Sequence, residues 1–229
     1  TGIGHKAFEA NQTGEHNSAL GFKAGDSNTT GYHNTFIGSQ AAEGCTTGFQ
    51  NTVVGYYSGT GITTATKNTF IGVQAGRYQT SSGGTYVGWY AGRGRTLGGG
   101  NVGVGQYAMA NSGGDANENT AIGYAALYEL TSGNNNSGVG NEAGKGVTSG
   151  YNNTCLGTQA GQSNSPSGSI TTGSNYICLG NDNVTDLFCA DTSIASSDSR
   201  DKADIANFTP GLSWVNALRP VTYKWDKRS

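Results

Sequence analysis

The sequence predicts an all-β fold: a homotrimeric parallel β-solenoid, or β-roll, of 17-residue coils, followed by a short mixed α/β segment at the C-terminal end. One observation is a glycine that recurs eleven times, nearly always after 17 residues. A second is that an aliphatic residue always precedes this glycine, and an asparagine stands four positions before most of its copies. A third is a small residue three positions after the glycine in the first ten repeats. The repeat glycines are Gly4, Gly21, Gly38, Gly55, Gly72, Gly88, Gly105, Gly123, Gly140, Gly157 and Gly180.

Each coil reads Asn-Thr-x-aliphatic-Gly-x-x-Ala-Gly, followed by a polar stretch. The Thr-x-aliphatic segment is too short and too β-branched for a helix, and a coil leaves room for about two short strands with turns. One aliphatic side chain per coil cannot bury itself, so we expect it to stack on the coils above and below. The small residue indicates a close approach of the backbone to another coil or to a symmetry mate. The asparagine suits a ladder of side-chain amides at a tight corner, where it tolerates unusual dihedrals.

The core of a single chain is predicted to be thin, since each coil offers one aliphatic residue and one alanine. Coils spaced about 4.8 Å apart would form a rod roughly 50 Å long over ten steps. We therefore expect a homotrimer whose axis buries part of each coil, because closed cyclic assembly hides such a surface.

Composition and charge exclude several classes of protein. The chain has 13 Lys and Arg against 15 Asp and Glu, so bulk charge excludes a basic nucleic-acid binder. No apolar run approaches the roughly 18 residues that span a bilayer, so no membrane insertion is expected. The cysteines and histidines lack metal-ligand spacing, and we expect neither a metal nor a cofactor. Cys155 and Cys178 share a repeat position and are expected to be small apolar residues rather than a disulfide. His16 and His33 also share a repeat position, which favours histidine rings stacked in a structural role over a metal site.

The C-terminal part changes character. From Asp182 the charge density rises and glycine nearly vanishes, which indicates a different module. We divide the chain into a repetitive rod at 1–180, a connector at 181–196 and a C-terminal module at 197–229. Within that module, a cap, an early proline and apolar spacing predict a short helix over 209–218, and alternation predicts a strand over 221–225.

The candidate binding surface lies one and two positions after the repeat glycine, where aromatic residues gather, Tyr107 and Tyr124 among them. Flat aromatic faces beside amide and hydroxyl groups suit saccharide rings, and nearby arginines add donors for acidic sugars or phosphate. The alternative is that these aromatics pack in the trimer or cover neighbouring coils. The candidate ligand-binding residues are Tyr56, Tyr57, Trp89, Tyr90, Arg93 and Arg95.

The repeat unit resembles the head repeats of trimeric autotransporter adhesins, over residues 1 to about 180. The resemblance implies a left-handed β-roll wound in a threefold trimer. The repeat of those adhesins is usually shorter than the one found in this chain.

The C-terminal module contains Ser197-Asp-Ser-Arg-Asp-Lys-Ala-Asp-Ile205 and Leu218-Arg-Pro-Val-Thr-Tyr223. Both segments closely resemble motifs of the endosialidase-type intramolecular chaperones, which end phage tail fibres, tailspikes and some bacterial fibre adhesins. The resemblance implies trimerisation and then self-cleavage at Ser196–Ser197, with Ser197 as nucleophile and Lys202 as its partner. A desolvated lysine whose pKa falls can take the serine proton. Because that family's chaperone is longer than residues 197–229, we expect the bond to stay uncleaved in this chain.

These observations predict a trimeric fibre-tip protein of a phage or phage-like particle, assembled in the cytoplasm and carried on the virion or another extracellular fibre. Its expected partners are further copies of itself and a host cell-surface polysaccharide or lipopolysaccharide, with no nucleic acid. No substrate-directed enzymatic activity is expected beyond possible self-cleavage by Ser197 and Lys202. Two alternatives stay open: a bacterial trimeric surface adhesin, and a polysaccharide-degrading tailspike.

Overall fold

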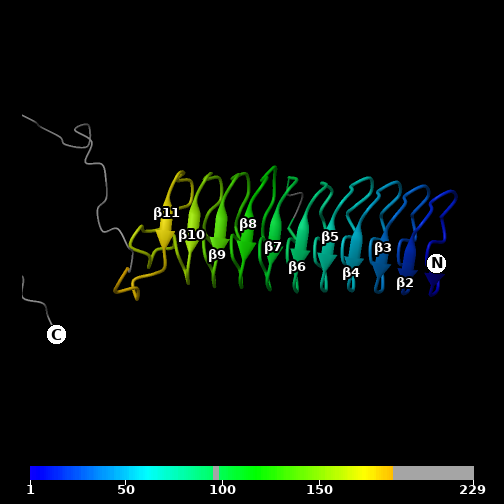
Figure 1. The fold of residues 1–229 in the computed structure, drawn as a ribbon, viewed down its shortest axis with the longest axis horizontal. Helices are drawn as coiled ribbons and strands as arrows, with labels where there is room; N and C mark the ends of the chain where they lie inside the picture. The colour runs from blue at the N-terminus through cyan, green and yellow to red at the C-terminus, as the bar shows by residue number, and fades with distance from the viewer. Residues whose placement is uncertain (95–97, 188–229) are drawn as a thin grey trace, which may run out of the picture. The chain divides into compact units, whose positions relative to one another are not determined.

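The computed structural model describes residues 1–94 and 98–187, which form eleven short strands and no helix. The strands run parallel in one sheet and follow chain order, so each coil adds one strand beside the previous one (Figure 1). This arrangement confirms the predicted β-solenoid. The strands are β1 (Gly2–Ile3), β2 (Ser18–Leu20), β3 (Thr35–Ile37), β4 (Thr52–Val54), β5 (Thr69–Ile71), β6 (Thr85–Val87), β7 (Val102–Val104), β8 (Thr120–Ile122), β9 (Ser137–Val139), β10 (Thr154–Leu156) and β11 (Ile177–Leu179).

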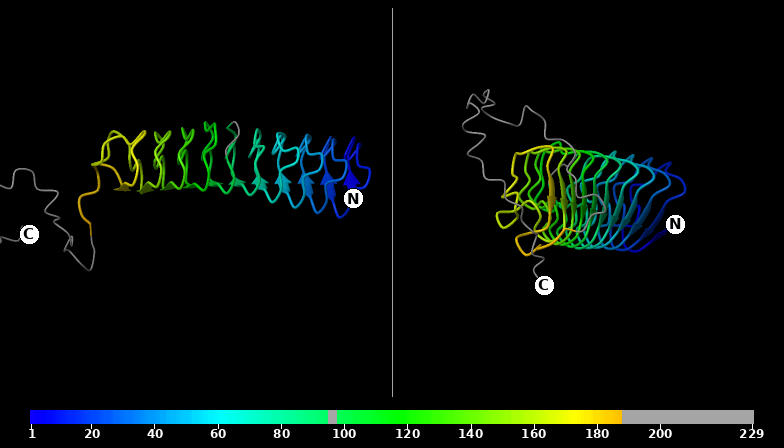
Figure 2. Two further views of the ribbon diagram at one scale, coloured as in Figure 1. Left: turned by 90° about the horizontal axis from the view of Figure 1, so that it is seen from above. Right: turned by 60° about the vertical axis from the view of Figure 1, so that its left-hand side comes forward.

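Each coil contains one strand rather than the two expected, and turns make up the rest. The strands of successive coils lie in one row along one side of the stack (Figure 2). Outside the strand, residues with positive φ repeatedly reverse the chain. In the coil that follows β4 these are Tyr57, Gly59 and Lys67, with φ of 53°, 58° and 60°. A left-handed residue ends an extended run, so no second strand forms between these corners.

The core lies inside each coil and is built from the middle residue of each strand. Phe36, Phe70 and Tyr86 occupy that position and are fully buried. The same buried cluster contains the small residue three positions after the repeat glycine, such as Ala75, and the residue seven positions after it, such as Ile62. The interior of one chain therefore contains at least three contributing positions per coil, more than the sequence predicts.

The aliphatic residue before the glycine faces outward, which corrects the prediction that it forms part of the core. Ile71 and Ile122 keep 40% and 42% of their surface exposed. Successive side chains of a strand point to opposite faces, so a buried middle residue places its neighbour outside. The predicted stacking between coils does occur, since Val54 lies in register with Ile37 and with Ile71.

The asparagines form the predicted ladder. Asn51 Nδ2 donates to Asn34 Oδ1 at 3.1 Å, and Asn68 Nδ2 donates to Asn51 Oδ1 at 3.1 Å. Asn51 Nδ2 also donates to the carbonyl oxygen of Ala65 at 2.9 Å. The unusual dihedral falls on the preceding residue instead of the asparagine; Gln50, for example, has φ of 57°. The amide ladder thus satisfies the backbone polar groups that this corner buries.

The repeat glycine is required by close contact between coils. Gly72 has φ of 136°, and a Cβ atom there would lie 2.4 Å from the carbonyl oxygen of Gly88 in the next coil. No side chain fits at that distance, which explains why the position is glycine in every repeat.

The described residues form one compact unit through Asp186. The predicted helix over 209–218 and the predicted strand over 221–225 lie outside the described residues, as does most of the 181–196 connector. The two boundaries of this division, after residues 180 and 196, remain predictions. A search of the described residues finds no helix long and apolar enough to cross a membrane.

Candidate functional site

Five aromatic residues from three consecutive coils form one surface cluster, which we call the aromatic cluster. Its members are Trp89, Tyr90, Tyr107, Tyr124 and Tyr128. The ring centroids of Trp89 and Tyr90 are 4.1 Å apart, and that of Trp89 lies 4.9 Å from that of Tyr107. Tyr107 then meets Tyr124 and Tyr128 edge to face at 6.0 and 6.3 Å. Trp89 remains 41% exposed, so its ring is available at the surface.

The solenoid brings these rings together because it places equivalent positions of successive coils side by side. The N–H of Tyr107 donates to the carbonyl oxygen of Trp89 at 3.0 Å, which joins the two coils beside their rings. Tyr90 and Tyr107 occupy the same left-handed corner, with φ of 59° and 61°. Their rings therefore stack at 5.7 Å between centroids. A spacing of one coil matches the separation that aromatic pairs prefer.

Tyr56 and Tyr57 form a separate pair whose centroids are 4.4 Å apart. The coil between this pair and the aromatic cluster has Val73 and Gln74 at the equivalent positions, so the row of aromatics is interrupted. The guanidinium of Arg77 lies 4.8 Å from the Tyr57 ring centroid. The sequence predicts one binding surface for Tyr56, Tyr57, Trp89 and Tyr90, whereas these residues lie in two groups.

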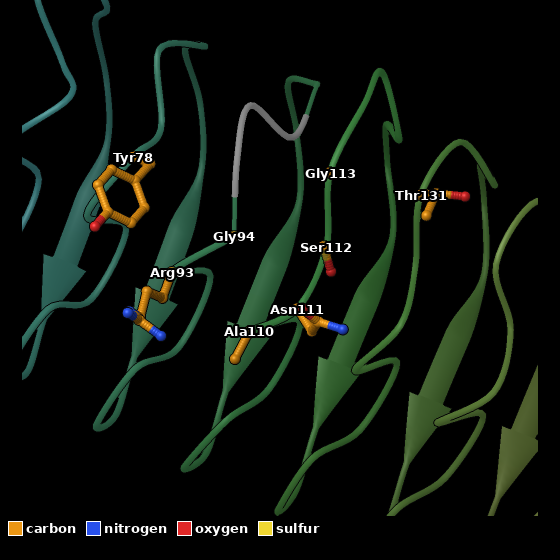
Figure 3. Close-up of a pocket in the computed structure, with 8 residues that line it drawn as sticks. All are labelled: Tyr78, Arg93, Gly94, Ala110, Asn111, Ser112, Gly113 and Thr131. Atoms are coloured by element: carbon orange, nitrogen blue, oxygen red, sulfur yellow. The ribbon is translucent and has the colours of Figure 1, made fainter.

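Beside the aromatic cluster, four consecutive coils line a groove of about 350 Å³, which we call the Arg93 groove (Figure 3). It is lined by Tyr78, Arg93, Gly94, Ala110, Asn111, Ser112, Gly113 and Thr131. Ser112 occupies the repeat position that Ile62 and Leu130 fill in other coils, seven residues after the glycine.

The polar groups of the Arg93 groove include two that lack a partner among the described residues. The Nε atom of Arg93 and the hydroxyl of Ser112 are buried without a hydrogen bond. The Arg93 guanidinium lies 4.6 Å from the Tyr90 ring centroid, so the groove adjoins the aromatic cluster. The positive charge of the guanidinium is thus left without a carboxylate partner beside the groove in the described part of the chain.

A smaller groove of about 250 Å³ lies on the aromatic cluster itself, lined by Tyr107, Tyr124, Ala125, Tyr128 and Lys145. The Lys145 ammonium pairs with the Glu142 carboxylate. The hydrogen bond between them lowers the pKa of Glu142 and raises the pKa of Lys145. Both groups are therefore charged at neutral pH, and the carboxylate already neutralises Lys145.

The predicted site residues are thus placed as follows. Trp89, Tyr90 and Arg93 lie together, while Tyr56 and Tyr57 lie apart from them. Arg95, Ser197 and Lys202 lie outside the described residues. The sequence analysis missed Tyr78, Ser112 and Tyr128, which come from other repeat positions. Aligning the coils by their glycines and looking for small residues where neighbours are large would have found Ser112.

The other residues singled out from the sequence have structural environments. Cys155 and Cys178 lie in register in β10 and β11 as free buried thiols, as predicted. The rings of His16 and His33 stack at 4.9 Å along one chain, and those of Tyr32 and Phe49 at 4.7 Å. The described residues contain no group of three His, Cys, Asp or Glu side chains that could hold a metal ion.

Comparison with known proteins gives one match. Residues 197–229 match the Peptidase S74 family, described as chaperone of endosialidase. The comparisons with curated proteins and with solved structures found no match. A chaperone-of-endosialidase segment that follows a β-solenoid fits a tail-fibre-like protein, and this family is associated with trimeric fibres.

Proposed function

We propose that this protein is a trimeric fibre-tip protein of a phage or phage-like particle that binds a glycan on the host cell surface. The single observation that carries the proposal is the aromatic cluster, five rings gathered at the surface of a repetitive rod. Three consecutive coils supply them, so the cluster runs along the rod and offers contacts to successive rings of a saccharide chain.

The chemistry of the surface supports a saccharide as the ligand. The C–H faces of sugar rings stack on exposed aromatic rings, and their hydroxyls need amide and hydroxyl partners at the edges. Trp89 supplies such a ring, and Asn111 and Thr131 supply exposed polar side chains in the adjoining groove. Charged residues make up 12% of the chain, so most of its polar side chains are uncharged amides and hydroxyls of the kind that pair with sugar hydroxyls.

The proposed trimer is supported by an exposed aliphatic stripe, formed by the residue before each repeat glycine. In one chain most of these side chains face solvent. A continuous apolar row of this length marks an interface in soluble proteins, and three copies around one axis would cover it. The stripe comprises Ile3, Leu20, Ile37, Val54, Ile71, Val87, Val104, Ile122, Val139, Leu156 and Leu179.

In this proposal, residues 197–229 assist trimer assembly, and the family match over these residues supports that role. Ser197 and Lys202 are the pair that would cleave the Ser196–Ser197 bond, which we expect to stay intact in this chain. Intact mass spectrometry of the purified protein beside its Ser197→Ala variant tests this expectation. Masses that differ only by the substitution would support an intact bond, and a fragment ending at Ser196 in the parent alone would contradict it.

Glycan binding is tested with immobilised bacterial surface polysaccharides and lipopolysaccharides. The parent protein should bind at least one of them, and Trp89→Ala should weaken that binding about tenfold or more, as for a central aromatic of an interface. The matched control is Tyr151→Ala, which removes an exposed tyrosine outside the aromatic cluster. Circular dichroism melting would verify that both variants fold.

Two results would overturn the proposal: no binding by the parent to any polysaccharide of the panel, or equal binding by the parent and Trp89→Ala. Shortened sugar chains after incubation would instead favour a polysaccharide-degrading tailspike.

A further inference from the structure

The Arg93 groove contains a cation that the repeat does not neutralise. In several coils the residues two and five positions after the glycine form a polar pair. Examples are Lys6 with Glu9 at 2.8 Å, and Gln74 Oε1 accepting from Arg77 at 3.1 Å. The other such pairs are Lys23 with Asp26, Gln40 with Glu43, and Glu142 with Lys145.

Arg93 occupies the fifth position of its coil, but the second position is Tyr90, which has no carboxylate or amide to offer. The guanidinium instead lies over the Tyr90 ring at 4.6 Å. Among the described coils, it is the one charged side chain at this position without a hydrogen bond or ion pair to another side chain. No carboxylate is found among the eight residues that line the groove.

Further polar residues line the same groove. Ser112 borders it, but its side chain is buried, at a repeat position that belongs to the core in other coils. Asn111, the residue before it, is exposed, and the ring of Tyr78 lies across the groove with 42% of its surface accessible (Figure 3). The volume of about 350 Å³ lies in the range of small-ligand sites, about 300–1,000 Å³.

We propose that the Arg93 groove is a subsite for an oxyanion carried by a saccharide, either a sugar carboxylate or a sugar phosphate. Arg93 supplies the positive charge and N–H donors for the anion, because a planar guanidinium binds both oxyanions well. Asn111 donates to the remaining oxygens, and Tyr78 stacks on the sugar ring. This inference rests on the proposed glycan binding and specifies its ligand as acidic.

The test uses immobilised acidic bacterial polysaccharides, each beside its neutral counterpart. Uronic acid polymers are compared with their carboxyl-reduced forms, and phosphate-bearing polymers with their dephosphorylated forms. The parent protein should bind an acidic polymer about tenfold or more tightly than its neutral counterpart. The two arms distinguish a carboxylate from a phosphate as the anion.

Variants then assign the anion to this groove. Arg93→Met removes the charge and should weaken acidic binding about tenfold or more, while leaving neutral binding unchanged. Asn111→Ala should weaken it about fivefold, as for one hydrogen bond. The matched control is Lys67→Met, because Lys67 is another surface cation of the rod that does not line the groove.

The inference is overturned if acidic and neutral forms bind equally, if Arg93→Met binds like the parent, or if Lys67→Met weakens binding as much as Arg93→Met. Neutral glycan binding that depends on Trp89 but ignores Arg93 would overturn the acidic subsite alone and leave the proposed function standing. Absence of binding to every polymer would remove both.

Discussion

Tyr86 has a well-packed ring but a hydroxyl without a hydrogen bond in the described part of the chain. Its ring lies in the core in register with Phe70, with centroids 5.4 Å apart. Its buried hydroxyl finds no hydrogen-bond partner among the described residues. The nearby Asn101 amide cannot serve. Its Nδ2 already donates to the carbonyl oxygens of Gly98 and Ala116, and its Oδ1 already accepts from the N–H and Nδ2 of Asn119 at 2.9 and 3.0 Å. Burial raises the pKa of Tyr86, so the hydroxyl stays protonated.

We therefore predict that Tyr86→Phe stabilises the protein by about 1 kcal/mol, since it removes an unpaired buried hydroxyl and keeps the ring. Equilibrium denaturation with guanidinium chloride measures the change. Tyr151→Phe, which alters an exposed hydroxyl, should leave the midpoint unchanged. A lower stability of Tyr86→Phe would indicate that the hydroxyl has a bound water as its partner.

The buried thiols make a second prediction at the residue scale. Burial raises the pKa of Cys45 from 9.0 to about 11, and burial beside Cys178 raises that of Cys155 to about 12. A raised pKa means that the folded protein favours the neutral thiol. This contribution to stability is present below the unfolded pKa and is lost as the pH rises through about 11 to 12.

Because the thiolate is the reactive form, the native Cys189→Ser variant should not react with a disulfide reagent at pH 8. The same variant in guanidinium chloride should react at its three remaining cysteines. Absorbance of the released thiol measures both results. Rapid labelling of the native protein at pH 8 would show that these side chains are accessible.

At the scale of the element, the asparagine ladder connects neighbouring coils through buried amides. Asn119 Oδ1 accepts from the N–H and Nδ2 of Asn136 at 2.8 and 3.0 Å. Asn119 Nδ2 donates to the carbonyl oxygen of Gly133 at 2.9 Å. One side chain thus satisfies backbone groups at two places in the next coil, in a corner that water does not reach.

Asn119→Ala should cost about 3 kcal/mol, because it leaves the buried Gly133 carbonyl and Asn136 N–H unpaired. Chemical denaturation measures the loss. Asn141→Ala is the control, since Asn141 is an exposed asparagine whose side chain makes no hydrogen bond in the described part of the chain, and it should change stability little. Equal effects of the two variants would mean that the ladder adds no stability.

At the scale of the whole molecule, the outward aliphatic stripe is an extended apolar feature that one chain leaves largely uncovered over its described coils. The strand alternation that buries Phe70 turns Ile71 outward, and the same alternation holds in the neighbouring coils. In register, Ile71 lies between Val54 and Val87, so the stripe is continuous. A charge introduced into the stripe would be buried in all three chains of a threefold assembly.

We predict that Ile71→Asp dissociates the proposed trimer into single chains. Multi-angle light scattering should show the mass fall from three chains to one, because three like charges would meet without partners near the axis. Gln106→Asp adds the same charge at an exposed position outside the stripe and should remain trimeric. A trimeric Ile71→Asp protein would place the axis elsewhere on the rod.

The candidate site was only partly predictable from the repeat. Trp89 and Tyr90 stand out because aromatic residues recur at their positions, and in-register stacking brings Tyr107 against them. Tyr128 occupies another repeat position, and it belongs to the aromatic cluster because its ring contacts that of Tyr107 in the neighbouring coil. That Ser112 borders a groove is visible only in the structure, since a groove is a property of neighbouring coils.

The 17-residue period was enough to predict the solenoid, its parallel strands, the asparagine ladder and the stacked cysteines, because a repeat that stacks in register places equal residues together. The number of strands per coil and the face that is buried depended on the three-dimensional structure. Left-handed corners at residues such as Tyr57 and Lys67 bend the coil closed, and this closure directs Phe70 inward and Ile71 outward. Phe70 and Ile71 are adjacent apolar residues in the sequence, so the sequence pattern does not determine which of them the closed coil buries.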